Sequence, residues 1–185
     1  MNRDAIISAL VKERDENTAR LSSVVGFQVT SGAGDTTKTI SAGSFLEKLQ
    51  SHAPDELTRS LSDNFLFGLH VLNVPQPFLI LKTGYYQNAF AGMIAWENDL
   101  ENDLGPIFIP QESELYASTT AGLLQRRMKF EDLVVKNRDT RALRGANSKI
   151  IFLYSFPDKN TIVITTNADT LEKISASLLT GKLVQ

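Results

Sequence analysis

Short hydrophobic runs along this chain are separated by turn residues and followed by stretches with helical spacing. The run at 64–72, "NFLFGLHVL", is joined to "FLILK" at 78–82 by "NVPQP", whose prolines cannot lie inside a paired central strand. A second pair, "KIIFLYSF" and "TIVITT" within 149–166, is rich in β-branched and aromatic residues and is joined by the tight-turn sequence "PDKN". The pattern predicts two β-hairpins.

A stretch with helical spacing follows each hairpin. We expect a helix from Tyr85 to Leu104, ended by the Gly105–Pro106 pair, because proline cannot continue a helix. Residues 167–179 place hydrophobic residues on one stripe and are followed by Gly181, which predicts a second helix. The stripe of this second helix consists of Leu171, Ile174 and Leu178. The order of strand, turn, strand and helix is therefore repeated.

An earlier part of the chain has the same order. "VVGFQVT" at 24–30 predicts a strand, a loop containing glycine follows, and "KTI" at 38–40 predicts a short return strand. Ser41 is the expected N-cap of the next helix, because its hydroxyl can accept a hydrogen bond from a free amide of the first turn. A short helix with Pro54 in its first turn comes next. The strings "EDLVVKN" and "DTRALRG", at 131–145, predict a further hairpin.

Repeated hairpin–helix units favour the α+β class, with an antiparallel or mixed β-sheet and helices packed mainly on one face. We expect a single α+β domain over residues 23–181, because a chain of 185 residues can bury one sizeable core. Residues 1–22 begin with hydrophobic residues at helical spacing and then carry six charges between Lys12 and Arg20. This pattern predicts an amphipathic N-terminal arm or linker. Residues 182–185 are expected to form a tail.

Composition excludes several chemistries. The hydrophobic content of 42% and the charged content of 22% are ordinary for a globular protein. With 19 basic and 21 acidic residues the net charge is −2, so we expect no nucleic-acid partner and no attraction to an anionic membrane. The absence of cysteine excludes disulfides, thiol nucleophiles and cysteine-ligated metals. No hydrophobic run approaches the roughly 20 residues of a membrane helix, so the chain as given is expected to be soluble.

Four carboxylates lie close together, at Glu97, Asp99, Glu101 and Asp103. On the expected helix successive residues are about 100° apart, so residues four positions apart share a face. Asp99 and Asp103 then point to solvent, whereas Glu97 and Glu101 lie on or beside the hydrophobic stripe. Because the four side chains do not converge, we expect no metal site here. The stripe consists of Phe90, Met93, Ile94, Leu100 and Leu104.

A carboxylate on a hydrophobic stripe needs a partner or a position at the rim. Residues 97–114 carry six acids and no base, whereas residues 126–149 carry eight bases and three acids. We therefore expect an ion pair between Glu97 and an arginine of the basic segment, with a rim position as the alternative. The two charged segments are also candidate surfaces for a protein partner or for self-association, which their charges would steer. The candidate partner-contact residues are Arg126, Arg127, Arg138, Arg141 and Arg144.

The candidate ligand-binding residues are Glu97, Trp96, Tyr85, Tyr86 and His70. Trp96 and the two tyrosines can line a pocket between sheet and helix, although aromatic residues on a core helix more often serve packing. His70 alternates with Leu66 and Leu72 on a strand, which favours a sheet-face histidine with one satisfied nitrogen over a base or ligand. The sequence has no nucleophile elbow, no histidine pair at ligand spacing and no matching phosphate loop. No catalytic residue and no cofactor is predicted.

The strings "NAFAGMIAWE" at 88–97, "VVKNRD" at 134–139 and "LYSFPDKNTIVITTN" at 153–167 resemble a family of membrane-anchored proteins from Patescibacteria, the candidate phyla radiation. The resemblance extends over roughly Ile6–Leu179. It implies the C-terminal region of a protein with a single transmembrane helix, and hence a domain outside the cytoplasmic membrane whose anchor is not in this chain. The family has no assigned function, so the resemblance implies no catalytic or binding residue.

Three functional hypotheses follow. The first is a non-enzymatic, extracytoplasmic binding or scaffolding module, which is favoured by the segregated charges, by the lack of convergent catalytic groups and by the resemblance. The second is a small-molecule-binding module with a pocket between sheet and helix near Trp96. The third is an enzyme in which Glu97 performs acid–base work with His70 or with an arginine.

Overall fold

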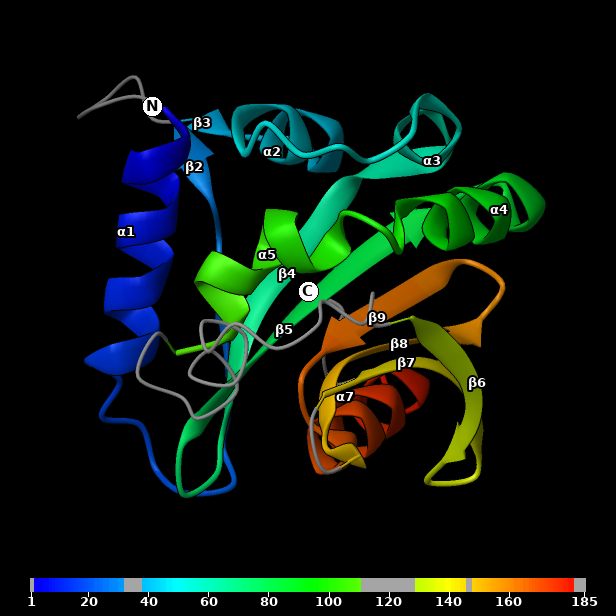
Figure 1. Cartoon of the computed structure of the whole chain (residues 1–185). Helices are drawn as coiled ribbons and strands as arrows, with labels where there is room; N and C mark the ends of the chain where they lie inside the picture. Colours follow the sequence, from blue (N-terminus) through cyan, green and yellow to red (C-terminus); the bar gives the residue numbers. More distant parts are fainter. Residues whose placement is uncertain (1, 32–37, 111–128, 146–147, 182–185) are drawn as a thin grey trace, which may run out of the picture.

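A seven-stranded β-sheet forms the centre of the structure, a computed structural model that describes residues 2–31, 38–110, 129–145 and 148–181 (Figure 1). The order of the strands is β1-β4-β5-β9-β8-β7-β6, and every neighbouring pair is antiparallel. The predicted α+β class is thereby confirmed. The strands are β1 (Val24–Phe27), β4 (Leu61–Val71), β5 (Pro75–Thr83), β6 (Phe130–Val135), β7 (Arg138–Arg144), β8 (Ile150–Asp158) and β9 (Thr161–Thr165).

The two hairpins predicted from the sequence meet in the middle of the sheet. The expectation that the prolines of the first hairpin lie outside the strands is wrong, because Pro75 and Pro77 pair with β4 at the start of β5. The strand accepts them there because β9 pairs with β5 only from Phe78 onward. β4 pairs with β5, β8 pairs with β9, and β5 and β9 then pair with each other, with Ile80 opposite Val163. The hairpin of β6 and β7 turns at Lys136 and Asn137, whose φ angles are 51° and 60°. Two positive φ values are typical of the type I′ turn, whose twist matches that of paired strands. The sheet is therefore assembled largely from local hairpins.

The prediction of one continuous strand over residues 24–30 is wrong. Only β1 joins the main sheet, whereas β2 (Thr30–Ser31) and β3 (Lys38–Thr39) form a separate two-stranded ribbon. The chain leaves the sheet because Val29 turns into the hydrophobic core, which also contains Ile40. The amide of Ile40 donates to the carbonyl of Val29 at 3.2 Å.

Helices cover both faces of the sheet, and most of them lie on one face (Figure 1). Residues of α1 to α5 form the larger hydrophobic core with the sheet, whereas α7 packs on the other face. There Leu171 and Ile174 of α7 meet Phe78 and Val163 of the sheet. The predicted placement of helices mainly on one face is confirmed. The helices are α1 (Arg3–Asp15), α2 (Ala42–Lys48), α3 (Asp55–Ser60), α4 (Tyr86–Trp96), α5 (Leu100–Phe108) and α7 (Ala168–Leu179).

Local sequence explains several helix ends. Ser41 caps α2 as predicted, and its hydroxyl oxygen accepts a hydrogen bond from the amide of Ser44 at 3.2 Å. Asn167 caps α7 by accepting from two amides of the first turn. Gly181 follows α7 with a φ of 69°, a conformation that glycine adopts without steric cost. Pro54 is the N-cap residue of α3, one position before the predicted one.

The prediction of one long helix from Tyr85 to Leu104 is wrong. The chain forms two helices, α4 and α5, and α5 continues past the Gly105–Pro106 pair instead of ending there. A proline inside a helix leaves the carbonyl four residues earlier without its amide partner. That carbonyl belongs to Asn102, and the guanidinium of Arg3 on α1 donates to it at 3.5 Å. A neighbouring helix thus satisfies the group that the proline leaves free.

The break between α4 and α5 changes which side chains are buried. Phe90 and Ile94, predicted to lie in the buried stripe, are 40% and 37% exposed. Asp103, predicted to point to solvent, is 2% exposed. In a continuous helix Trp96 and Asp103 would be about 10 Å apart along the axis. The turn between the helices brings the Trp96 indole Nε1 within 2.6 Å of the Asp103 carboxylate.

The N-terminal segment, expected as an arm or linker, contains a helix that contributes to the core. Ile6 and Leu10 of α1 are buried with the residues of α5 and the sheet. Arg14, which is 4% exposed, donates from Nη1 to the carbonyl of Ile107 at 2.7 Å. The last carbonyls of a helix lack amide partners and favour a cation. Arg14 therefore fastens α1 to the C-terminal end of α5.

Candidate interaction surface

Glu97, at the end of α4, holds an ion pair that links this helix to the sheet. Its two carboxylate oxygens accept hydrogen bonds from Nε and Nη2 of Arg141 on β7, both at 2.7 Å. One of these oxygens also accepts from the Tyr154 hydroxyl at 2.7 Å. A bidentate contact between a guanidinium and a carboxylate fixes orientation as well as distance. The predicted ion pair between Glu97 and an arginine of the basic segment is confirmed.

The surroundings of Arg141 and Tyr154 raise the pKa of both groups. The hydrogen bond to Glu97 raises the pKa of Arg141, although burial acts in the opposite direction. Burial, and then the hydrogen bond to Glu97, raise the pKa of Tyr154. Arg141 therefore remains a cation and Tyr154 a neutral donor at physiological pH. Because both oxygens of Glu97 are engaged, the geometry favours a structural contact over acid–base work.

His70 lies on the other face of the sheet from Glu97. Glu97 contacts Tyr154 on the face that α1 to α5 cover, whereas the Nδ1 atom of His70 is 3.1 Å from Oγ1 of Thr170 on α7. His70 is 4% exposed, and burial followed by the charge of Lys173 lowers its pKa. The predicted sheet-face histidine with one satisfied nitrogen is confirmed. The structure does not bring His70 and Glu97 together as an acid–base pair.

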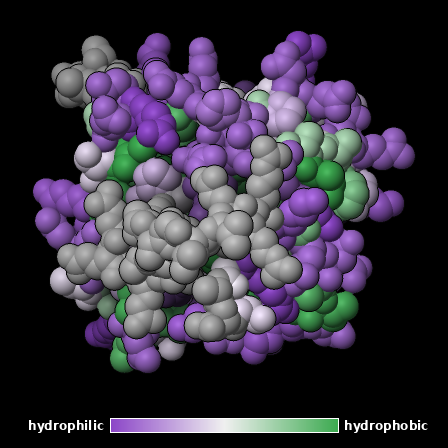
Figure 2. Space-filling view, in the orientation of Figure 1, coloured by the Kyte–Doolittle hydropathy of each residue, from purple (hydrophilic) through white to green (hydrophobic). Residues whose placement is uncertain are grey.

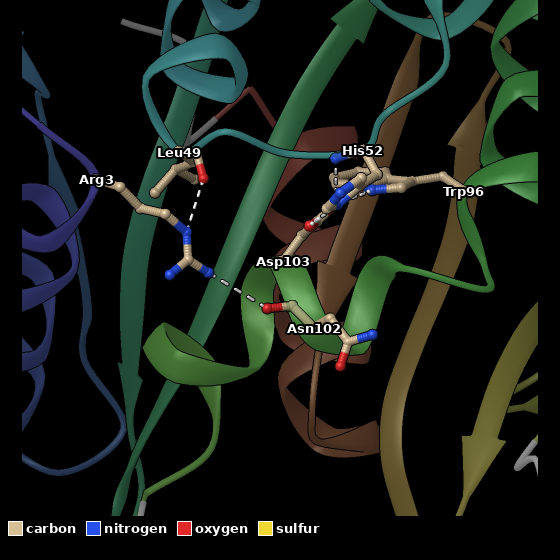
Figure 3. Close-up of polar contacts among 6 residues, drawn as sticks. All are labelled: Arg3, Leu49, His52, Trp96, Asn102 and Asp103. Carbon is tan, nitrogen blue, oxygen red and sulfur yellow. Dashed lines mark hydrogen bonds and ion pairs between the residues drawn. The ribbon is translucent and has the colours of Figure 1, made fainter.

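Trp96 is fully buried and belongs to a second polar cluster (Figure 3). Its indole Nε1 donates to Oδ2 of Asp103 at 2.6 Å. The same carboxylate accepts from the backbone amide of His52 at 2.7 Å, and its Oδ1 is 2.9 Å from the His52 ring Nδ1. One buried carboxylate thus joins α4, α5 and the loop after α2. With no exposed surface, Trp96 serves the core and is not available to a ligand.

The charge state of His52 is coupled to this carboxylate. The hydrogen bond with Asp103, and then its charge, raise the pKa of His52. Asp99 adds to the increase, whereas burial and the nearby Arg3 oppose it. The His52 side chain is 69% exposed, while that of Asp103 is 3% exposed. An exposed imidazole that can be protonated is therefore in contact with a buried carboxylate.

Sequence reasoning missed the Asp103 cluster. Asp99 and Asp103 are the same residue type four positions apart, so a continuous helix assigns them one common face. The available signal was the pair Asn98–Asp99, because both residues favour turns and N-caps. Asp99 is indeed the N-cap residue of α5.

The arginines predicted to contact a partner are divided between the two faces of the sheet. Arg141 points towards Glu97. Arg138 belongs to the alternate set of β7 residues, which lies on the face of the sheet that α7 covers. Arg144 forms an ion pair with Glu131 of β6. Much of the charge of the basic segment that the structure describes is therefore paired within the chain. Arg126 and Arg127 lie outside the described residues.

An aromatic cluster is exposed along α4. Tyr86, Phe90 and Ile94 are 37%, 40% and 37% exposed, and Tyr85, which precedes the helix, is 69% exposed. Phe156 of β8 packs against Tyr86 and Phe90, with ring centroids 5.2 and 5.8 Å apart. We call these five residues the α4 aromatic face. Figure 2 shows hydrophobic surface over this part of the molecule.

The outer side of α4 also lacks charge. The helix contains no charged residue, and its other exposed residues are Gln87, Asn88, Ala91 and Ala95. Surface helices ordinarily carry charged residues opposite their buried stripe. Single exposed hydrophobic residues are common, but a contiguous group with a polar rim marks an interaction site. The α4 aromatic face is therefore the candidate functional site, and it includes the predicted residues Tyr85 and Tyr86.

Surface depressions among the described residues include one next to α4 and one at the β6 edge of the sheet. One of about 280 Å³ lies beside Tyr85, and one of about 270 Å³ lies in the β6–β7 hairpin. Both are smaller than the roughly 300–1,000 Å³ of most small-molecule sites, and neither is lined by Glu97, Trp96 or His70. No three histidine or acidic side chains in the described ranges are arranged to hold a metal ion. The first depression is lined by Asp55, Glu56, Arg59, Ser60, Tyr85 and Asn88.

Within the part of the chain that the structure covers, no helix is both long and apolar enough to cross a membrane. No family model, curated protein or solved structure matches this chain. The α4 aromatic face is therefore the feature of the described residues that bears most directly on function.

Proposed function

We propose that this chain is a non-enzymatic binding or scaffolding module that holds a protein partner on the α4 aromatic face. One observation carries the proposal: α4 buries Met93 and Trp96 on one side and exposes Phe90 and Ile94 on the other, with no charge on either side. Surface helices ordinarily carry charged residues on their outer side, and a helix that exposes large hydrophobic residues there instead is ordinarily covered. A partner that covers the outer side of α4 would complete this burial.

Covering this face would stabilise a complex. Full burial of a phenylalanine or isoleucine side chain is worth about 1.5–3 kcal/mol, so the exposed two fifths of Phe90 and Ile94 leave roughly 0.6–1.2 kcal/mol each to gain. Phe156 packs against Tyr86 and Phe90, so these rings lose little freedom on binding. Aromatic side chains held in this way are typical anchors of protein interfaces.

Two carboxylates inside the fold are already bound by other side chains, and this favours a binding role for the protein over catalysis. Glu97 is bound by Arg141 and Tyr154, and Asp103 is bound by Trp96 and His52. Each carboxylate therefore contributes to packing between elements. This engagement weakens the hypothesis of acid–base chemistry at Glu97.

A small-molecule site has less support than a protein interface. The small-molecule hypothesis requires a pocket near Trp96, but Trp96 has no exposed surface that a ligand could reach. The depression beside Tyr85 is smaller than most ligand sites. The hydrophobic area of α4 is continuous instead, as expected for contact with another protein surface.

We place the module outside the cytoplasmic membrane, in a membrane-anchored parent protein, on the basis of the family resemblance. Thiol labelling is a direct test, because this chain has no cysteine and Val74→Cys would introduce one at a position that is 55% exposed. In intact cells that produce the parent protein, a membrane-impermeant maleimide should label the Val74→Cys variant more strongly than the unsubstituted parent. Labelling that requires cell lysis would contradict the placement.

Photo-crosslinking in the producing cells tests the binding role. A photoreactive amino acid at Ala91, which is exposed on α4, should give a discrete adduct with a partner protein. The same amino acid at Val74, in the β4–β5 turn, should not, and Ile94→Ser should abolish the adduct at position 91. Equal adducts from both positions, or an adduct that survives Ile94→Ser, would contradict the proposal.

A further inference from the structure

We infer that the α4 aromatic face receives an amphipathic helix of a partner protein, and that this helix carries lysine or arginine residues beside its hydrophobic stripe. The inference rests on the proposed function and specifies the chemistry of the partner. Two independent properties support it: the relief of the outer side of α4, and the charge around that side.

The outer side of α4 has the relief of a helix-packing surface. Tyr86, Phe90 and Ile94 are four positions apart and form one ridge along the helix. Gln87, Ala91 and Ala95 each follow a ridge residue by one position and form an exposed second row, which the two alanines make lower than the ridge along its C-terminal half. Helices pack by placing the ridge of one into the groove of the other, at interaxial distances of about 8–10 Å. Large side chains beside a row of alanines fit this geometry.

The length of the ridge sets the size of the partner segment. From Tyr86 to Ile94 the helix rises about 12 Å. A partner helix of about three turns, with hydrophobic residues at i, i+3, i+4 and i+7, covers this distance. The uncharged surface then faces the hydrophobic stripe of the partner, and the flanks of the partner lie over the surrounding rim.

The segments next to α4 carry acidic residues. Asp55 and Glu56 of α3 border the depression that includes Tyr85, at the N-terminal end of α4. Asp158 lies at the end of β8, the strand whose Phe156 packs on α4. Asp99 follows α4 at its C-terminal end. Four acidic residues therefore lie on the segments that adjoin α4 in the sequence or pack against it.

Basic residues of the described chain offset these acids only in part. Arg59 is paired with Asp55 at 2.9 Å, and Arg141 is paired with Glu97. Lys159 lies in the β8–β9 turn. The remaining negative field favours basic flanks on the partner and steers their approach over roughly 8–10 Å at moderate salt. A second copy of this chain would bring the same acids against each other, which disfavours self-association.

Two synthetic peptides of about 18 residues, or five helical turns, test the inference. Both carry a leucine stripe at helical spacing, and the polar positions are lysine in one and glutamate in the other. Fluorescence anisotropy with the full chain measures the two affinities. We expect the lysine peptide to bind at least about tenfold more tightly, and this preference to shrink as salt rises. A scrambled lysine peptide, which keeps the charge but lacks the stripe, should bind at least about tenfold more weakly.

Variants of the chain locate the binding site. Combining Phe90→Ser with Ile94→Ser should weaken binding of the lysine peptide by about tenfold or more. Val74→Ser removes a similarly exposed hydrophobic residue elsewhere and should leave the affinity unchanged. Ile94→Lys is a second variant, and it should weaken the lysine peptide more than the glutamate peptide. Glu56→Gln should weaken the lysine peptide by about two- to threefold and reduce its salt dependence. The melting temperature of each variant verifies that it is folded.

The outcomes separate the inference from the proposed function. Equal affinity for the lysine and glutamate peptides would overturn the inference. Concentration-dependent self-association that Phe90→Ser and Ile94→Ser remove would also overturn it, but would retain α4 as a binding surface. Peptide binding that ignores both substitutions would overturn the inference as well. If position 91 in addition gave no cross-link in cells, the proposed function would fail with it.

Discussion

Replacing Asp103 by alanine should destabilise the domain strongly. The carboxylate accepts hydrogen bonds from the Trp96 indole and from the His52 backbone amide at a position that is 2% exposed. A donor left without a partner in such a place costs about 1–3 kcal/mol, so two donors give an expected loss of about 2–6 kcal/mol. Small domains have about 5–15 kcal/mol of stability in total. The substitution therefore removes a large share of it.

Asp103→Asn is the milder form of the same perturbation. One oxygen remains an acceptor, but the new amide group donates and meets one of the donors that the carboxylate satisfied. We expect a loss of about 1–3 kcal/mol in the free energy of unfolding. Asp99→Asn is the matched control, because it makes the same change of charge at a half-buried position whose side chain makes no cap hydrogen bond. Its effect should stay within about 0.5 kcal/mol.

Urea unfolding measures these differences directly. Trp96 is the single tryptophan of the chain and is fully buried, so its fluorescence reports the transition. The midpoint should fall for Asp103→Asn and Asp103→Ala while the slope stays constant, since a changed slope signals a change in the denatured state. Equal effects of Asp99→Asn and Asp103→Asn would refute the reasoning. That result would favour a continuous helix with both aspartates in solvent.

Three further predictions concern other contacts of the domain. Because the folded-state pKa of His52 is raised, its bond to Asp103 contributes stability that is complete below the ordinary histidine pKa of about 6.5 and is lost as pH rises through the folded value. His52→Gln should therefore lower the melting temperature at pH 5.5 more than at pH 8, and an equal effect at both pH values would refute this coupling. Glu97→Ala should cost about 2–4 kcal/mol, because it leaves Arg141 partly buried without its main partner. The double variant with Arg141→Met should lose less than the sum of the single variants, which urea unfolding of the four proteins would show. Gly92→Ala should cost about 1–3 kcal/mol, because a Cβ atom there would lie 2.6 Å from α3, and a fully stable variant would disprove this close approach.

The hairpins and their helices could be predicted because their signals are local. The strings "NVPQP" and "PDKN" indicate where the chain reverses, although Pro75 and Pro77 lie at the start of β5 and Pro157 and Asp158 at the end of β8. The flanking strands are hydrophobic or alternate between hydrophobic and polar residues. The order of the strands in the sheet, with β5 beside β9, depends on contacts between residues far apart in sequence. The backbone departs from the predicted elements at residues 24–30 and at residues 97–99. Val29 is buried in the core at the first place, and Trp96 is buried at the second.

The candidate site and the contacts beside it could likewise be predicted only in part. The ion pair of Glu97 could be predicted, because a carboxylate on a hydrophobic stripe requires a partner and the basic segment offers one. Burial of Phe90 and Ile94 was the natural prediction for hydrophobic residues at helical spacing, and it is wrong for both. Sequence rules that describe a folded core are expected to fail at functional surfaces, where hydrophobic side chains are kept for a partner. The failure at these two positions is therefore itself an argument for the α4 aromatic face.

Amide chemical-shift mapping tests the central claim, that the α4 aromatic face is the binding surface. The labelled chain would be titrated with the lysine peptide, and the shift of each backbone amide would be followed. We predict that the largest changes lie along α4 and around Phe156, with the β4–β5 turn at Val74 unaffected. Largest changes in α7 or in the β6–β7 hairpin, with the amides of α4 unmoved, would contradict the account.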